Sequence, residues 1–174
     1  MSFIIYEFAL KAKFSAIICS MRTLVIYDSA YGNTQKIAKA IAGAIDATAS
    51  LVKDITPEDI KGVELLVVGS PTQGGQPLAP ILSFLRSLPS GSLKGVKCAA
   101  FDTRFAKDDH GLFLKIVTNV FGYAADKIDS LLNAKGGQLI TGGEGFIVTA
   151  KTGPLGPGEI DRAKKWAKEI VQAP

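Results

Sequence analysis

Residues 23–45 read TLVIYDSAYGNTQKIAKAIAGAI, in which a strand, a polar turn and a helix follow one another directly. Residues 23–27 form a short apolar run rich in β-branched residues, which is typical of a parallel strand buried on both faces. From residue 34 to residue 45 the apolar spacing changes to that of a helix. The apolar face of this helix carries Ile37, Ala38, Ile41, Ala42 and Ile45. A strand that leads through a short turn into an amphipathic helix begins a βαβ unit.

The same alternation continues to the end of the chain. Further strands are predicted at Leu51-Val52, at 64–68, at 96–101 and, in two parts separated by Gly142-Gly143, at 138–140 and 145–149. Helices are predicted from Pro57, around Leu78, Ile81, Leu82 and Leu85, along the stripe Phe113, Ile116, Val117, Val120, Phe121 and Ala124, and at 159–172. Five strands alternating with about five helices predict an α/β fold, in which helices cover both faces of a parallel sheet.

Composition narrows the class of protein. The chain has 174 residues, of which 47% are hydrophobic and 21% charged, as in a single globular domain. Lys and Arg number 20 against 16 Asp and Glu, a net charge of +4 spread along the chain rather than concentrated as nucleic-acid binding requires. Two cysteines, Cys19 and Cys98, and one histidine, His110, are too few for a disulfide framework or a structural zinc site. We expect a soluble cytoplasmic domain without a metal site.

The first twenty residues differ from the rest. Their apolar sequence is interrupted by Glu7, Lys11 and Lys13, which argues against a secretory signal and against a membrane span. Met21 stands immediately before the first strand. One hypothesis is that Met21 is the natural start, with residues 1–20 as an upstream N-terminal extension and 21–174 as the domain. The alternative is that residues 1–20 form a genuine peripheral element.

Ligands of such sheets bind beyond the carboxyl ends of the strands, so the loops there are the candidate site. The first loop, residues 28–34, opens a helix and offers free backbone N–H groups and the hydroxyls of Ser29 and Thr34 to an anion. Its single glycine, Gly32, matches neither a triphosphate-binding loop nor a dinucleotide fingerprint. The alternative is an ordinary helix start with Asn33 or Thr34 as its N-cap.

Two further loops have unusual compositions. In residues 69–77 the tandem glycines Gly74-Gly75 allow positive φ angles and the close approach of a flat group, or simply a mobile turn. After the fourth strand, Asp102 and Thr103 offer hydrogen bonds to the edge of a heterocycle, and Phe105 offers a face for stacking. The alternative for residues 101–105 is a capped turn with a surface salt bridge.

Residues 25–34, 69–75 and 101–104, together with the ending 145–167, resemble the flavodoxin family in order and spacing. The resemblance implies a three-layer flavodoxin-like fold of strand order 2-1-3-4-5 with FMN as cofactor. It implies that the first loop cradles the phosphate, the second lines one side of the isoalloxazine and the third lines the other. The residues implied are Ser29, Ala30, Tyr31, Gly32, Asn33, Thr34, Pro71, Thr72, Gln73, Gly74, Gly75, Asp102, Thr103, Arg104 and Phe105.

By the same resemblance the protein is a low-potential electron carrier, a monomer or weak dimer that exchanges electrons with a redox protein and has no catalytic residue. Three features depart from the family pattern: Tyr31 replaces a threonine, the second loop has no tryptophan, and the net charge is positive. Tyr31 fits the first alternative, an FMN-dependent quinone or protoporphyrinogen oxidoreductase. The missing tryptophan fits the second, a flavin-free interaction module.

The remaining residues of interest have structural interpretations. Cys98 lies in a predicted strand and is expected to be a buried small hydrophobic residue. His110 is expected in a solvated loop, while Tyr123 and Trp166 are expected to pack on helices.

Overall fold

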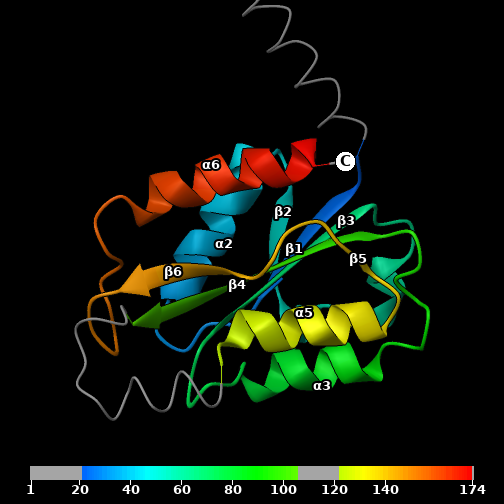
Figure 1. The fold of residues 1–174 in the computed structure, drawn as a ribbon, viewed down its shortest axis with the longest axis horizontal. Helices are drawn as coiled ribbons and strands as arrows, with labels where there is room; N and C mark the ends of the chain where they lie inside the picture. Colours follow the sequence, from blue (N-terminus) through cyan, green and yellow to red (C-terminus); the bar gives the residue numbers. More distant parts are fainter. Residues whose placement is uncertain (1–20, 106–121, 174) are drawn as a thin grey trace, which may run out of the picture.

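The computed structural model describes residues 21–105 and 122–173. Strands and helices alternate along these two ranges (Figure 1). The strands there are β1 (Thr23–Tyr27), β2 (Thr48–Leu51), β3 (Leu65–Pro71), β4 (Lys97–Phe105), β5 (Gln138–Leu139) and β6 (Glu144–Val148). The helices there are α2 (Asn33–Ala44), α3 (Ala79–Ser87), α5 (Ala124–Ala134) and α6 (Glu159–Gln172), with short 3-10 turns η1 (Val52–Asp54) and η2 (Pro57–Ile60).

The strands form one parallel sheet in the order β2-β1-β3-β4-β5, which confirms the order implied by the family resemblance. The last position is filled by two segments, because both β5 and β6 pair with β4. Lys97 of β4 lies opposite Gln138 of β5, and Phe101 of β4 lies opposite Glu144 of β6. The predicted fifth strand in two parts is therefore confirmed.

Helices cover both faces of this sheet. Helices α2 and α6 lie on one face, and α3 and α5 lie on the other (Figure 1). Because side chains alternate along a strand, Val25 of β1 belongs to the core beneath α2 and α6, whereas Ile26 belongs to the core beneath α3 and α5. Trp166 of α6 is 6% exposed and packs in the first of these cores. The three-layer α/β architecture predicted from the sequence is confirmed.

Two strands extend further than predicted. The sequence places residues 102–105 in a loop, but β4 continues through them. This prediction was wrong because β4 has partners on both sides: Thr103 lies opposite Pro71 of β3, and Phe105 lies opposite Val148 of β6. The backbone groups of these polar residues are thus used by the sheet. Strand β3 likewise includes residues 69–71.

Other boundaries also differ. Strand β2 ends at Leu51, before the predicted Val52, which begins η1 instead. Helix α5 was not predicted as a separate helix, because the apolar stripe up to Ala124 suggested one long helix ending there. Most of that stripe lies outside the described residues, as do His110 and the whole of residues 1–20. No helix in the described ranges is long and apolar enough to cross a membrane.

Candidate functional site

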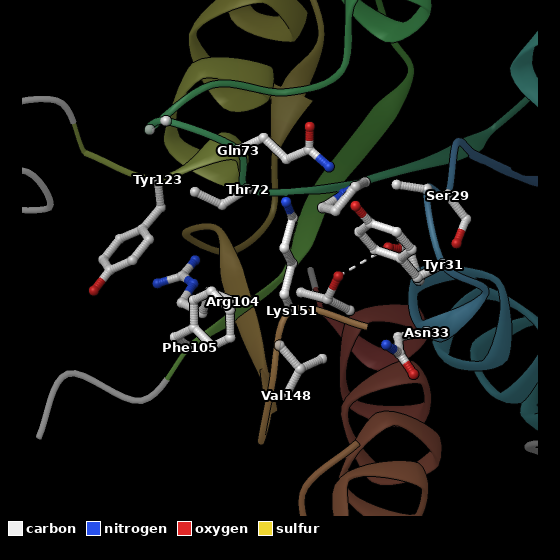
Figure 2. A pocket seen from close by; sticks show the side chains of 16 residues that line it. Ser29, Tyr31, Asn33, Thr72, Gln73, Arg104, Phe105, Tyr123, Val148 and Lys151 are labelled. Atoms are coloured by element: carbon white, nitrogen blue, oxygen red, sulfur yellow. Dashed lines mark hydrogen bonds between the residues drawn. The ribbon is translucent and has the colours of Figure 1, made fainter. Parts of the chain in front are cut away.

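A pocket of about 410 Å³ lies at the carboxyl ends of β1, β3, β4 and β6 (Figure 2). Its position next to the β1–β3 switch in strand order is where doubly wound sheets bind ligands. Its lining residues are Ser29, Ala30, Tyr31, Asn33, Thr34, Pro71, Thr72, Gln73, Gly74, Gly75, Thr103, Arg104, Phe105, Tyr123, Val148 and Lys151. The structure thus brings the three candidate segments into one cavity.

The first loop leaves the start of α2 open towards the pocket. Gly32 is the N-cap, in the left-handed region at φ 84°, and no side chain caps the helix within the described chain. The alternative interpretation, an ordinary helix start with Asn33 or Thr34 as its N-cap, was therefore wrong. Both side chains are buried and bond elsewhere: Asn33 donates to the Thr152 carbonyl at 3.2 Å, and the Thr34 and Thr103 hydroxyls lie 2.8 Å apart. The backbone N–H groups of the first turn can therefore bind an anion.

The second loop is a tight two-residue turn. Gln73 and Gln76 exchange both backbone hydrogen bonds at 3.0 Å, with Gly74 and Gly75 between them at φ 57° and φ 74°. Two consecutive positive φ angles define a type I′ turn, which strongly favours glycine. The prediction of positive φ angles at both glycines is confirmed. Thr72 then anchors this turn to β4, because its N–H donates to the Thr103 carbonyl at 2.9 Å.

The end of β4 carries a buried ion pair. The Arg104 Nε and Nη2 atoms donate to the two carboxylate oxygens of Asp102 at 2.5 and 2.7 Å, and the Ala125 N–H donates to Asp102 at 3.0 Å. Burial raises the pKa of the Asp102 carboxyl, and the Arg104 guanidinium partly offsets the rise. The guanidinium carbon lies 3.6 Å from the centre of the Tyr123 ring, which covers the pair.

Asp102 is 0% exposed and does not line the pocket. Its oxygens accept hydrogen bonds from Arg104 and Ala125 instead, and its expected hydrogen bond to a heterocycle stays a prediction. Gly32 is the other candidate that does not line the pocket. All the remaining candidates do. Whether they bind a ligand stays a prediction.

Three residues that line the pocket, Tyr123, Val148 and Lys151, were not predicted from the sequence as part of the site. Tyr123 was expected to pack on a helix, but it stands just before α5 and borders the cavity beside Arg104 (Figure 2). Val148 and Lys151 come from the end of β6 and the loop after it, where the Gly-rich sequence gave no signal of a site. At the mouth, Tyr31 is 47% exposed and presents its ring to the pocket (Figure 2).

The geometry is that of an α/β protein with a pocket at a strand-order switch, next to the uncapped first turn of α2 at Asn33 and Thr34, which is called the anion cradle below. Within residues 21–105 and 122–173 no group of three or more His, Cys, Asp or Glu side chains is placed to hold a metal ion. The chain belongs to the flavodoxin family, whose model (Flavodoxin) matches residues 25–169.

Known relatives agree with this assignment. A Synechocystis protein named diflavin flavoprotein A 3 is 28% identical over 123 residues, which are 66% of this chain and 18% of that protein. This chain therefore spans less than a fifth of that relative's length. A flavodoxin from the domain Archaea superposes with a TM-score of 0.67 at 20% identity, covering 87% of this chain and 97% of the other. The Flv1 flavodiiron core of Synechocystis gives 0.62 at 22% identity, covering 88% and 36%. At these identities the structural matches show the fold alone.

Proposed function

We propose that the pocket binds FMN and that the protein transfers electrons through it. The observation that carries this proposal is the single cavity in which the first loop, the Gly74-Gly75 turn and the end of β4 meet. Its volume of about 410 Å³ lies within the range of about 300–1,000 Å³ usual for small-molecule sites. Membership of a flavin-binding family supports the same cofactor class.

The donor set fits the two chemically different ends of FMN. The open first turn of α2 and the Ser29 and Thr34 hydroxyls suit the phosphate. The Gly74-Gly75 turn on one side, with Phe105 and the Arg104–Tyr123 pair on the other, offers flat and apolar surfaces to the isoalloxazine. The residues present therefore fit the group.

When bound, FMN would supply one-electron and two-electron transfer. The residues around it bind and orient it and set the local charge. Arg104 is paired with Asp102, whereas Lys151 has no counter-ion and no Asp or Glu lines the pocket among the described residues, so the net charge of the lining is positive. The low potential that the resemblance implies stays a prediction.

A redox protein is the proposed partner. In two similar proteins, named as a diflavin flavoprotein and a flavodiiron core, the part that matches this chain is 18% and 36% of the polypeptide. In the present protein the half-exposed Tyr31 marks the pocket mouth, where an electron donor or acceptor can approach. A partner bound at this mouth can exchange electrons with the cofactor directly, without a path through the protein core.

The proposal is tested by the visible absorption spectrum of the purified protein, recorded before and after incubation with FMN and desalting. We expect a retained flavin spectrum close to one equivalent. A protein that stays colourless after reconstitution would refute FMN binding and favour the flavin-free alternative. NAD(P)H oxidation in the presence of a quinone then separates the two remaining proposals, since an electron carrier shows no turnover with these substrates alone.

A further inference from the structure

Lys151 belongs to none of the three segments that the sequence singles out, yet it lines the same pocket. Figure 2 shows its side chain extending into the cavity from the loop after β6. Within the described part of the chain Lys151 forms no ion pair. Its charge is therefore available to a ligand.

The loop that carries Lys151 is fixed at two points. Val148 and Leu155 form a β-bridge across its base. Next to Lys151, the Thr152 carbonyl accepts a hydrogen bond of 3.2 Å from the Asn33 side chain, which belongs to the first turn of α2. The Lys151 backbone is thus held beside the anion cradle before any ligand arrives, which reduces the ordering cost of binding.

The two cations of the pocket are not equivalent. The charge of Arg104 is offset by Asp102, with which it forms two hydrogen bonds of 2.5 and 2.7 Å. Lys151 has no such counter-ion among the described residues, and no Asp or Glu of the described chain lines the cavity. Lys151 therefore supplies the uncompensated positive charge of the lining.

We infer that Lys151 is a specificity-determining residue, which selects a flavin with a terminal phosphate over a flavin without one. This inference rests on the proposed function, because it concerns the same pocket. The first loop offers N–H and hydroxyl donors, which bind a phosphate without neutralising its charge. Lys151 provides the neutralising charge from a fourth segment.

The test compares FMN and riboflavin, which differ only in the phosphate. Their dissociation constants are measured on flavin-free protein by quenching of flavin fluorescence. In the Lys151→Gln variant we expect the FMN constant to rise about tenfold, while the riboflavin constant stays within about twofold. Because an exposed charge is screened by ions, the FMN constant of the unchanged protein should also rise more steeply with salt than that of the variant.

Two control variants sharpen the result. Lys168→Gln removes the same charge from the exposed face of α6, which runs back from the carboxyl end of β6, and should leave both constants unchanged (Figure 1). Lys151→Arg keeps the charge and should retain the preference for FMN. Thermal melts of each variant establish that the fold is intact.

The inference would be overturned if Lys151→Gln raised the dissociation constants of FMN and riboflavin equally, or if it left the FMN constant unchanged. If the unchanged protein binds neither flavin, the proposed function fails, and inorganic phosphate serves as the probe instead. Phosphate should then raise the melting temperature of the unchanged protein more than that of Lys151→Gln. Equal protection of the two proteins would overturn the role of Lys151 independently of the flavin.

Discussion

At the scale of single residues, the side chains at the end of β4 point alternately to the two faces of the sheet. Asp102 accepts a hydrogen bond of 3.0 Å from the first turn of α5, whereas the hydroxyl of Thr103 lies 2.8 Å from that of Thr34 on the opposite face. This alternation is the period-two geometry of a strand. It places Asp102 on the same face as Arg104, its counter-ion, next to the first turn of α5.

Removing the Arg104 guanidinium should destabilise the folded protein, because it leaves the buried carboxylate of Asp102 without a counter-ion. We expect Arg104→Met to lower the free energy of unfolding by about 3 kcal/mol, since Asp102 is 0% exposed. The double variant Arg104→Met/Asp102→Asn should recover much of that loss, because no unpaired charge remains. Urea unfolding curves at neutral pH measure both effects.

An exposed ion pair provides the comparison for Arg104. Lys164 and Asp161 lie 3.2 Å apart with exposed side chains, so Lys164→Met should cost less than about 1 kcal/mol. A loss of the same size in Lys164→Met and Arg104→Met would contradict the role of burial.

Asp129 of α5 should make stability depend on pH. Its side chain is 9% exposed, one carboxylate oxygen has no hydrogen-bond partner within the described chain, and burial, with Asp126 nearby, raises its pKa to about 6. In the unfolded chain its pKa is about 3.9. Between these values the folded state binds more protons, so this residue's contribution to stability falls as the pH rises from about 4 to about 6.

The substitution Asp129→Asn removes that penalty. We expect the variant to be more stable than the unchanged protein by about 1–2 kcal/mol at pH 7 and to show little gain at pH 4. Urea unfolding at several pH values measures the difference, and Asp54→Asn, the same substitution at an exposed position, serves as the control. A gain of equal size at both pH values would show that the ionisation of Asp129 is not responsible.

At the scale of elements, the loop after β6 fits against the first turn of α2 only because Gly153 has no side chain. Gly153 adopts a φ of 101°, and a Cβ added there would lie 2.6 Å from the Nδ2 atom of Asn33. Asn33 is the residue that holds this loop through the Thr152 carbonyl. One glycine therefore connects the position of Lys151 to the anion cradle.

The substitution Gly153→Ala should separate the effect of close packing from that of backbone strain. Gly91→Ala is the matched control, because Gly91 also has a positive φ, 75°, but a Cβ there meets nothing within 4 Å. We expect Gly91→Ala to cost about 1 kcal/mol from strain alone. Gly153→Ala should cost more and also weaken FMN binding, whereas Gly91→Ala should leave binding unchanged. If Gly153→Ala and Gly91→Ala lowered the stability in urea equally and changed FMN affinity equally, this account would be contradicted.

At the scale of the whole molecule, the spacing of apolar residues predicted the strands and helices that form the core. The residues at the rim of the pocket were predicted only in part. Helix α6 was predicted with its observed bounds, because one face of it is apolar along its whole length. Asp102 was misplaced, because polar residues suggested a loop where two neighbouring strands in fact extend the sheet. Lys151 and Tyr123 were missed because their place in the pocket depends on how distant segments pack, which no local pattern encodes.

The two cores of the sheet also predict where the domain begins. Both faces are covered by α2, α3, α5 and α6, and β1, which begins at Thr23, is an interior strand between β2 and β3. We therefore expect a chain of residues 21–174 to keep the urea midpoint and the FMN affinity of the full chain. A chain that starts at Val25 should not fold, because it loses Thr23 and Leu24 and their pairing with Leu65 and Leu66 of β3. A lower midpoint or weaker FMN binding in the 21–174 chain would instead show that residues 1–20 contribute to the folded domain.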